Sequence, residues 1–431
     1  MKRVLLPALA VLSGCATYHP APLPDAAPAT KPLTTALPLT LTKLAALAVK
    51  RDPELVAARA QAGIAQAELL AAGTLPDPSL SIGVEALLSG PASMSAVAGS
   101  LVEDVSPIIT RSVDVSAAKA HLLQVNAGIL WQEWQVATRA ELLGVALTGE
   151  AAQLTSLNRD VQALTALDQE VRAQTAAGNL TQQDVSATQT TLATLRTTLD
   201  AEEQAQVQGE AQLDALLALP SGTPVALASP DVPAIPAARR QMAIATLARR
   251  RPDLLALRYG YTEADEKLRA AIRRQFLPIS LGAQGGRDTS GVVSVGPQIT
   301  LSLPLFNRNR PAIKADEATR AALRAQYTAS LDEARNGAEE LGQSIVLLQR
   351  QTAQAGHAAA REAAIAANAS HAFAAGRLDA RAETNLIIAA GEREREVIQL
   401  RTQLQTAEIS LAMLLGIGLP AEEEVAHQPA E

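Results

Sequence analysis

The sequence predicts an α+β chain in which one supersecondary unit, made of long helices and short strands, is used twice. The chain has 431 residues, and its second half repeats the first at an offset of about 199 residues. The segment 51–55 (Arg-Asp-Pro-Glu-Leu) returns at 250–254 (Arg-Arg-Pro-Asp-Leu), and 176–180 (Ala-Ala-Gly-Asn-Leu) returns at 374–378 (Ala-Ala-Gly-Arg-Leu). Such a unit is far longer than the roughly 20 to 50 residues of a solenoid repeat. We therefore expect two halves that are equivalent in space.

The composition favours long helices that pack closely side by side. Aromatic residues make up 2% of the chain and charged residues 19%, while Ala, Leu, Gln, Thr and Arg dominate. Small and straight-chain residues are good helix formers and allow neighbouring helices to approach. The net charge of -7, and the lack of a basic stripe with interleaved aromatic residues, argue against a nucleic-acid partner.

The N-terminus is typical of an exported bacterial lipoprotein. Residues 1–14 combine a basic start with an apolar run too short to span a bilayer, which predicts a signal peptide. Cys15 ends a Leu-Ser-Gly-Cys box that resembles the bacterial lipoprotein processing site, and it is the only cysteine, which excludes a disulfide within the chain. Ala16 in place of Asp implies, by that resemblance, sorting to the outer membrane. Residues 15–40, rich in Pro, Ala and Thr, are expected to form a lipidated, extended tether.

The first repeat is expected over residues 41–219. Its elements are a helix over 41–72 that Pro53 kinks or restarts, a strand near 80–86, a second strand over roughly 101–107, a helix over 108–176 and a return helix that ends near Leu219. Glu103 and Asp104 interrupt the alternation of the second strand. We expect these two acids either at the rim of a membrane wall or turned inward by a bulge. The long helix has leucines at coiled-coil spacing and, if straight, spans on the order of 100 Å.

The second repeat is expected over residues 237–419, after a linker over 220–236 that holds five prolines. Its elements are a helix over 237–275, strands near 279–283 and 293–303, a helix over 311–375 and a last helix that ends near 415. The strand at 293–303 has one aliphatic face and one small or polar face, and Pro297 on the aliphatic face is a candidate bulge. The end of the chain, 420–431, is expected to be an acidic, solvated tail.

The predicted strands are too few to close on themselves. Each repeat supplies two strands, and four strands cannot form a barrel, whereas an open edge is not tolerated in lipid. Their expected length of roughly nine to eleven residues is enough to cross a bilayer when tilted. A closed wall therefore needs several copies, and three copies give twelve strands, an even number within the usual range. Phe276 and Phe306 lie at strand ends, where they form either part of an aromatic belt or ordinary core packing.

The chain resembles the TolC-like outer-membrane efflux proteins, including their lipid-anchored members, over residues 40–420. The resemblance rests on the duplicated Arg-x-Pro-x-Leu start, the segment 303–310 (Leu-Pro-Leu-Phe-Asn-Arg-Asn-Arg) and the two Ala-Gly-x-Leu tips. It implies an α+β membrane protein that forms a homotrimer, with a twelve-stranded β-barrel in the outer membrane continued by a long periplasmic α-helical coiled-coil barrel. It also implies a passive, non-enzymatic exit duct for drugs or divalent metal ions, whose far end meets a periplasmic adaptor protein and an inner-membrane RND pump. The segment 102–109 is most similar to the divalent-metal branch of the family.

The turns at the two Ala-Gly-x-Leu tips are the candidates for gate and adaptor docking. The candidate residues are Gly178, Leu180, Thr181, Asp184, Gly376, Arg377, Leu378, Asp379, Arg381 and Glu383. Threefold symmetry turns each charge into a ring of three, and such rings set ion preference or hold a constriction shut through ion pairs, for example between Asp184 and Arg377. For Asp184 and Asp379 the alternative is helix capping, in which the carboxylate accepts backbone N–H groups at a helix start.

No residue pattern points to catalysis, metal binding or a cofactor. The five histidines have no zinc spacing, and no phosphate loop or Gly-x-Ser-x-Gly element occurs. Two other functions remain open. The same fold could serve as the outer-membrane duct of a type I protein-secretion system, or the chain could be a lipid-anchored periplasmic coiled-coil scaffold without a pore. The scaffold alternative predicts no strands over 279–305.

Overall fold

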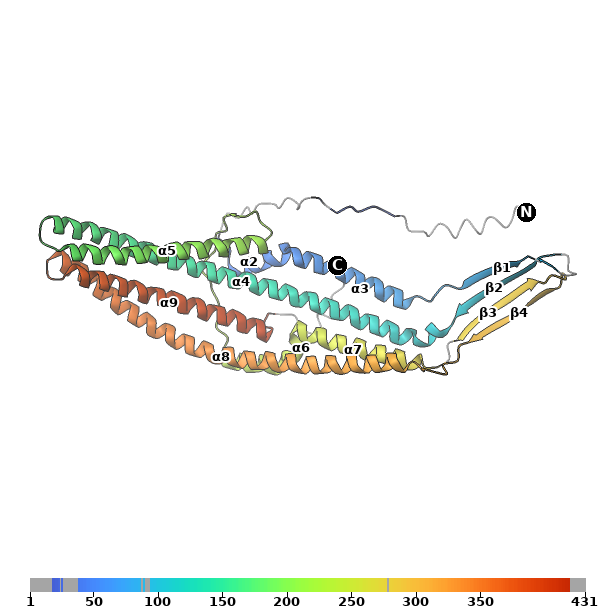
Figure 1. The fold of residues 1–431 in the computed structure, drawn as a ribbon. Helices are drawn as coiled ribbons and strands as arrows, with labels where there is room; N and C mark the ends of the chain where they lie inside the picture. The colour runs from blue at the N-terminus through green and yellow to red at the C-terminus, as the bar shows by residue number, and fades with distance from the viewer. Residues whose placement is uncertain are drawn as a thin grey trace.

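The computed structural model of the protein describes residues 18–23, 25, 38–86, 88–89, 94–276 and 279–418. The molecule is elongated, with a small sheet at one end and the turns of two helical hairpins at the other (Figure 1). The predicted signal peptide, Cys15, most of the predicted tether and the predicted acidic tail lie outside the described residues. Long helices connect the two ends, so the described chain is organised along one axis.

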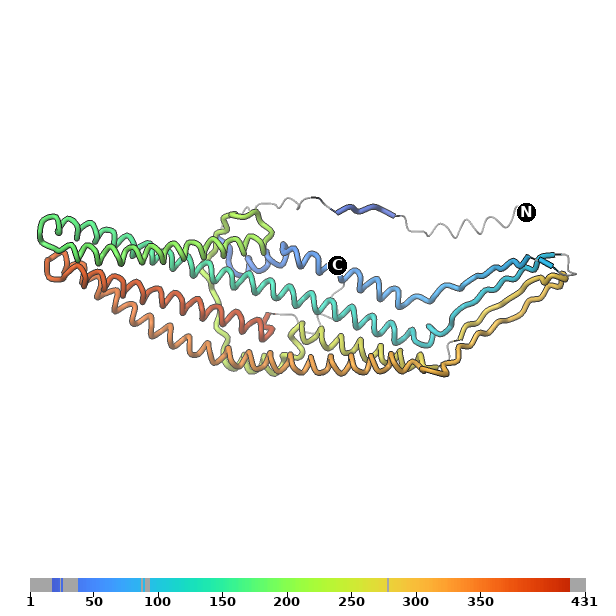
Figure 2. Tube along the Cα trace, in the orientation of Figure 1, coloured from blue at the N-terminus to red at the C-terminus, as the bar shows by residue number. Residues whose placement is uncertain are grey.

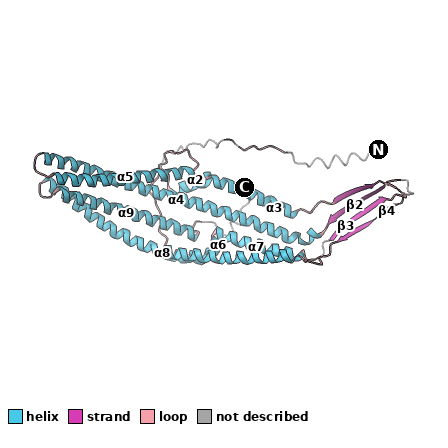
Figure 3. Ribbon diagram, viewed as in Figure 1, coloured by secondary structure: helices cyan, strands magenta, loops and turns pink. Residues whose placement is uncertain are grey.

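The element order of the first half recurs in the second half. The first half contains α2 (Leu41–Arg51), α3 (Pro53–Gly73), β1 (Ser79–Glu85), β2 (Ala96–Asp104), α4 (Ser106–Ala176) and α5 (Gln182–Leu216). The second half contains α6 (Ala237–Arg250), α7 (Pro252–Arg273), β3 (Ile279–Arg287), β4 (Val293–Leu301), α8 (Arg310–Ala374) and α9 (Ala380–Leu415). Figure 3 shows the strands gathered at one end of the long helices. The predicted fold of each chain, two repeats of long helices with paired strands, is confirmed.

One proline in each repeat separates its two short helices. Pro53 is the first residue of α3, and Pro252 is the first residue of α7. Proline lacks the N–H that the first turn of a helix leaves unbonded anyway, and it pushes the preceding residue out of helical geometry. Arg251 accordingly has φ -80° and ψ 122°. The prediction of one continuous helix over 237–275 was wrong, whereas the restart at Pro53 is one of the two outcomes expected.

The second strand begins and ends earlier than predicted. β2 covers Ala96–Asp104, not 101–107, because small residues that show no alternation still pair with strands on both sides. The strand cannot continue to 107 because Pro107 lies in the first turn of α4. The side chain of Asp104 accepts a hydrogen bond from the backbone N–H of Ser106 at 2.9 Å, next to the start of that helix. This bond pairs one of the N–H groups that a helix start leaves free.

The long helices and the strands form a curved wall, against which α2 and α6 pack. The strands are antiparallel in the order β1-β2-β3-β4. Next to the sheet the helices contact one another in the order α3-α4-α7-α8, and toward the turns in the order α5-α4-α9-α8. Figure 2 shows α4 running through the middle of the wall and α8 along one side. The wall therefore has two edges along its length, one formed by β1, α3 and α5 and the other by β4 and α8.

Three clusters of buried aliphatic side chains hold the wall together. One lies in the first repeat around Leu44 and Leu217, and another lies in the second repeat around Leu247 and Leu415. The third lies near the turns, where Leu164 and its neighbours on α4 and α5 pack with residues of α9. A fully buried side chain of this size stabilises the fold by about 1.5–3 kcal/mol. The third cluster therefore holds the two hairpins side by side close to their turns.

Candidate channel wall and closing tips

The two faces of the sheet differ in chemistry. Residues paired directly across antiparallel strands project on the same face, and successive residues project on opposite faces. The register puts Leu80, Ile82, Val84, Val97, Leu101, Ile279, Leu281, Ala283, Val293, Val295, Pro297, Ile299 and Leu301 on one face, the aliphatic face. Two charged residues, Glu103 and Arg287, lie on the same face at opposite ends of the sheet. The opposite face, the polar face, carries Ser79, Ser81, Glu85, Ala96, Ala98, Ser100, Asp104, Ser280, Gln284, Ser294, Gln298 and Thr300, with Gly83, Gly286, Gly296 and one aliphatic residue, Val102.

The aliphatic face is uncovered in the single chain. Ile82 is 72% exposed, Val295 85% and Ile299 65%, although such side chains are normally buried. The polar-face residues supply most of the lining of a hollow of about 810 Å³ on the sheet. An exposed aliphatic surface of this extent marks a contact with lipid or with another protein.

The register of the strands answers two questions that the sequence left open: whether Pro297 forms a bulge, and where Glu103 and Asp104 lie. Pro297 pairs with Ala283 within a continuous ladder, so no bulge forms there. Glu103 likewise pairs with Leu281 in an unbroken register. Glu103 and Asp104 lie at the end of β2 next to α4, which is the rim position that was one of the two alternatives.

The sheet joins the helices through a short, hydrogen-bonded junction. The hydroxyl of Ser106 accepts a hydrogen bond from the backbone N–H of Ile279 at 3.0 Å, and the amide of Asn309 donates to the carbonyl of Ala271 at 2.8 Å. Phe276 and Phe306 lie at this junction and are 70% and 100% exposed. They are therefore at the strand ends, and core packing within the single chain does not account for either; their place in an aromatic belt stays a prediction.

Gly178 and Gly376 are where the two hairpins turn. Their φ angles are +80° and +67°, a backbone conformation that other residues rarely adopt. The N–H of Asn179 bonds the carbonyl of Gln174 at 2.9 Å, and the N–H of Arg377 bonds the carbonyl of Ala372 at 2.8 Å. Both bonds belong to the cap that commonly ends a helix at glycine. The two turns are equivalent in structure, as the duplication predicts.

Asp184 and Asp379 cap the helices that follow the turns. Asp184 accepts hydrogen bonds from the backbone N–H of Thr181 at 2.9 Å and from its hydroxyl at 2.6 Å, in a capping box at the start of α5. Asp379 accepts a hydrogen bond from the N–H of Ala382 at 2.7 Å, at the start of α9. The bonds from Thr181 lower the pKa of Asp184, and the charge of Arg381 acts in the same direction. Both acids therefore have a capping role, whatever their part in gating.

The two arginines of the second tip are both exposed. The charge of Arg381, from the other hairpin, helps to lower the pKa of Asp184. Leu180 and Leu378 are half-buried beside the turns. An ion pair that holds the gate, whether between Asp184 and Arg377 or with another cation of the tips, stays a prediction.

Glu383 differs from the other tip acids because it is buried. It is 5% exposed, and its Oε2 atom has no hydrogen-bond partner. Burial raises the pKa of Glu383, and a hydrogen bond with Ser370 of α8 opposes that rise. The sequence indicates a surface charge at this position, but the packing of α9 against α8 encloses it.

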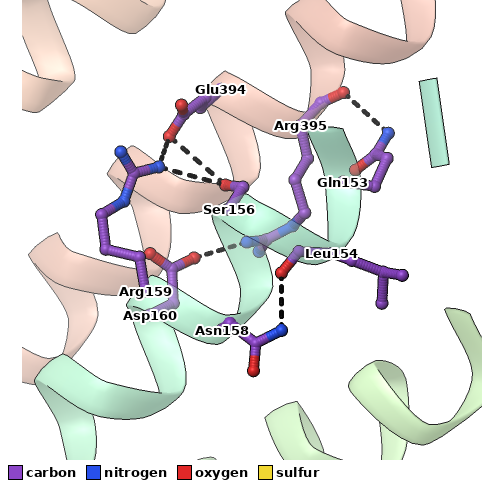
Figure 4. Close-up of polar contacts among 8 residues, drawn as sticks. All are labelled: Gln153, Leu154, Ser156, Asn158, Arg159, Asp160, Glu394 and Arg395. Atoms are coloured by element: carbon purple, nitrogen blue, oxygen red, sulfur yellow. Dashed lines mark hydrogen bonds and ion pairs between the residues drawn. The ribbon is translucent and has the colours of Figure 1, made fainter. Parts of the chain in front are cut away.

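A cluster of charges, which we call the clasp, joins the two hairpins above their turns (Figure 4). Asp160 of α4 binds Arg395 of α9, and Arg159 of α4 binds Glu394 of α9. The side chains of Asp160 and Arg395 are 8% and 16% exposed, whereas those of Arg159 and Glu394 are 59% and 44% exposed. Burial raises the pKa of Asp160, and the hydrogen bond from Arg395 opposes that rise. The buried pair therefore depends on both partners being present.

Gly391 makes room for the clasp. A Cβ atom at this position of α9 would collide with the carboxylate of Asp160. The hydroxyl of Ser156 donates to Glu394 at 3.3 Å, and the amide of Gln153 donates to the carbonyl of Arg395 at 3.2 Å. The clasp was not predicted from the sequence; the opposite charges adjacent at 159–160 and at 394–395 are the signal that could have indicated it.

A second polar link lies nearer the sheet. The Nδ1 atom of His121 on α4 is 3.1 Å from Glu263 of α7, and its Nε2 atom is 3.5 Å from Glu68 of α3. Across the described part of the chain, no group of three or more His, Cys, Asp or Glu residues is arranged to hold a metal ion. None of the helices within those residues is both long enough and apolar enough to cross a membrane.

Comparison with solved structures identifies the class of fold. The outer membrane protein VceC of Vibrio cholerae matches with 17% sequence identity and a TM-score of 0.73, over 87% of this chain and 96% of that one. CusC matches with 16% identity and a TM-score of 0.74, over 93% and 99% of the two chains. The Campylobacter jejuni CmeC outer membrane channel matches with 13% identity and a TM-score of 0.72, over 90% and 89%.

These matches cover nearly the whole chain, so the protein has the fold of bacterial outer-membrane channels. No protein-family model and no curated protein sequence matches the chain. The fold expected from the TolC-like resemblance is confirmed, and at these identities the likeness extends to the fold alone.

Proposed function

We propose that the protein is the outer-membrane channel of a tripartite, RND-type efflux system, in which it works as a homotrimer and a passive exit duct. The observation that carries the proposal is the sheet with one exposed aliphatic face and one polar face. A membrane β-barrel needs such strands, because residues facing lipid alternate with residues facing the lumen. A duct needs no catalytic group, and none is proposed.

The open edges of the sheet support assembly from several copies. β1 and β4 are the outer strands of a four-stranded sheet, and each leaves backbone N–H and C=O groups unpaired on one side. Such groups cost several kcal/mol each in hydrocarbon, so a barrel must be closed. Three copies supply twelve strands, an even number in the range of bacterial outer-membrane barrels. The helical wall would continue the barrel as an α-helical tube into the periplasm.

The hairpin turns support a gate and a docking surface at the far end of the tube. Threefold symmetry would repeat Asp184, Arg377 and Arg381 around the opening, as rings of charge that hold it shut or select ions. A periplasmic adaptor protein and an inner-membrane RND pump would meet these tips. The cargo would be drugs or divalent metal ions, and lipidated Cys15 would anchor each chain in the outer membrane.

One alternative remains and one is disfavoured. The duct of a type I protein-secretion system would use the same fold, and purification together with the native inner-membrane partner discriminates between the two systems. The scaffold without a pore predicts no strands over 279–305, whereas β3 and β4 occupy most of that range. We therefore keep the duct as the proposed function.

The decisive experiment is conductance in planar lipid bilayers, with paired substitutions on the two faces of β2. Leu101 and Ser100 are neighbours in the middle of this strand, on the aliphatic and the polar face. Leu101→Arg should abolish insertion, because an arginine on the lipid face costs about 2–4 kcal/mol at the midplane. Ser100→Arg should insert and shift ion preference toward anions, because it faces the lumen. Equal insertion of both variants, or no conductance from wild-type trimers even after mutation of the tips, would overturn the proposal.

A further inference from the structure

The segment 303–310, which connects β4 to α8, forms an exposed patch that is apolar at its start and basic at its end. Leu305 and Phe306 are 69% and 100% exposed. Arg308 and Arg310 are exposed as well, and neither forms an ion pair within the described residues. Large apolar side chains next to unpaired arginines suit a boundary between lipid and water.

The first repeat contains an equivalent segment whose arginine is already occupied. Residues 107–111 (Pro-Ile-Ile-Thr-Arg) match residues 304–308 (Pro-Leu-Phe-Asn-Arg) without a gap. The two isoleucines are 56% and 48% exposed, so the apolar part of the patch occurs in both repeats. The guanidinium group of Arg111, however, donates two hydrogen bonds to the carbonyl of Gly73, the last residue of α3, at 3.0 and 2.7 Å.

Asn309 takes over this role in the second repeat and leaves Arg308 free. The side-chain amide of Asn309 donates a hydrogen bond to the carbonyl of Ala271, near the end of α7, at 2.8 Å. Asn309 does so with a φ of +55°, a left-handed conformation that asparagine tolerates better than most residues. Its N–H also bonds the side-chain oxygen of Asn307 at 2.9 Å. The guanidinium group of Arg308 is therefore available to a ligand from outside the chain.

The position of the segment along the molecule points to lipid as the source of that ligand. The segment leaves the sheet at the end from which the helices extend, as Figure 1 shows. If the sheet spans the outer membrane, this end lies at the headgroups of the inner leaflet. Leu303 and Leu305 continue the odd-numbered positions of the aliphatic face, which β4 ends with Leu301. Side chains stand roughly perpendicular to a sheet, whereas a neighbouring copy would join the strand edge in the plane of the sheet.

We propose that the segment 303–310 is a binding site for an anionic phospholipid of the inner leaflet. Leu305 and Phe306 enter the acyl chains, and Arg308 and Arg310 bind the phosphate of the headgroup. A guanidinium group binds a phosphate with two parallel hydrogen bonds, and each basic residue near an anionic membrane surface favours binding by about fivefold. The proposal rests on the proposed function, because that function places the sheet in the membrane.

The site distinguishes the two repeats, which otherwise have the same arrangement at this height. Both repeats offer apolar side chains to the acyl chains, but only the second offers free arginines to the headgroup. Each copy of the chain would therefore hold one anionic lipid beside the start of α8.

Quenching of tryptophan fluorescence by brominated lipids tests the position of the segment. Full-length Phe306→Trp protein, reconstituted in vesicles of phosphatidylcholine with brominated acyl chains, should be quenched strongly. The native Trp131 and Trp134 lie about 25 residues or more beyond Ser106 along α4, which is about 38 Å or more from the sheet, so they give an unquenched background. Ile365→Trp, at a 46% exposed position of α8 near the turns, is the matched control and should not be quenched.

A minor fraction of phosphatidylglycerol in the same vesicles tests the recognition of the headgroup. With bromine on one lipid at a time, each phosphatidylglycerol molecule should quench the Phe306→Trp variant at least about fivefold more than each phosphatidylcholine molecule. Adding Arg308→Gln and Arg310→Gln should remove this preference and leave the quenching by both lipids. Adding Arg324→Gln and Arg350→Gln, at exposed positions of α8 about 21 Å or more from the segment, should leave the preference intact.

The outcomes separate this inference from the proposed function. Absence of quenching by either lipid would show that protein, such as another copy, covers the segment and would overturn the proposal. Equal quenching by the two lipids would leave apolar contact without headgroup recognition, and a preference that survives Arg308→Gln with Arg310→Gln would place the recognition elsewhere; both results would overturn it. Conductance in planar bilayers without a lipid preference would refute the site and leave the duct standing. A lipid preference without conductance would keep the segment in the membrane and refute the duct.

Discussion

The clasp gives the sharpest test of how the two hairpins are held together. Arg395→Met removes the cation that faces Asp160 while keeping a long side chain in the same space. The side chains of Asp160 and Arg395 are 8% and 16% exposed, so the carboxylate would be left buried and unpaired. Removing one partner of a buried ion pair costs about 3–5 kcal/mol. Arg159→Met breaks the neighbouring pair, whose side chains are 59% and 44% exposed, and should cost at most about 1 kcal/mol.

Hydrogen exchange of the amides around the clasp measures this difference directly. A loss of about 3 kcal/mol in local opening corresponds to exchange that is faster by about two orders of magnitude, since about 1.4 kcal/mol is tenfold. We expect this acceleration in α4 and α9 for Arg395→Met at neutral pH, and less than about tenfold for Arg159→Met.

The effect of Arg395→Met should also depend on pH. Burial already raises the pKa of Asp160, and loss of Arg395 removes the hydrogen bond that opposes the rise. A group whose pKa is raised in the folded state stabilises the fold below its unfolded pKa and loses this contribution as the pH rises through the folded value. The penalty should therefore shrink at mildly acidic pH. Equal acceleration of hydrogen exchange in Arg395→Met and Arg159→Met at neutral pH would refute the claim that the buried pair is the one that holds the hairpins together.

Two further predictions concern the tips. Glu383→Gln should stabilise the tips increasingly as the pH rises from about 4.5 toward neutrality, because burial raises the pKa of Glu383 and the wild type loses stability through that range. Thermal unfolding of both proteins at several pH values measures this difference in stability. Unfolding temperatures that change with pH in parallel for the two proteins would contradict the prediction. Asp184→Ala and Arg377→Ala should each raise the leak conductance in bilayers if these residues hold the gate, and unchanged conductance in both would count against an ion-pair gate.

The sequence predicts the turns and the clearest strand well because their signals are local. Gly178 and Gly376 each need a backbone angle that glycine adopts most easily, and the duplicated tip motifs around them mark both turns. The alternation over 293–303 predicts β4 because each of its faces has one chemistry. β2 begins five residues before its predicted start because Ala96 to Ser100 carry no periodic signal, although Val97 to Ser100 pair with strands on both sides.

Tertiary packing determines which charged residues meet and which are buried, and the sequence pattern does not show this. Asp160 and Arg395 are 235 residues apart in the sequence and meet only because α4 and α9 lie side by side. Glu383 has the same appearance in the sequence as Asp379, yet Asp379 caps a helix at the surface while Glu383 is enclosed against α8. A hairpin tip with many charged residues therefore predicts a functional region, but the sequence does not tell which of these residues are exposed to solvent.

α4 buries many more of its residues in the single chain than α8 does, and this difference links the stability of α8 to the association of copies. α4 buries 18 of its 71 residues in the single chain, whereas α8, of similar length, buries six of 65. Helices this long gain most of their stability in water from packing of an apolar face rather than from helix propensity. In the single chain α8 packs mainly against α9 and α7. Its stability should therefore be coupled to the association of copies, so that trimer formation and the ordering of this edge rise and fall together with protein concentration.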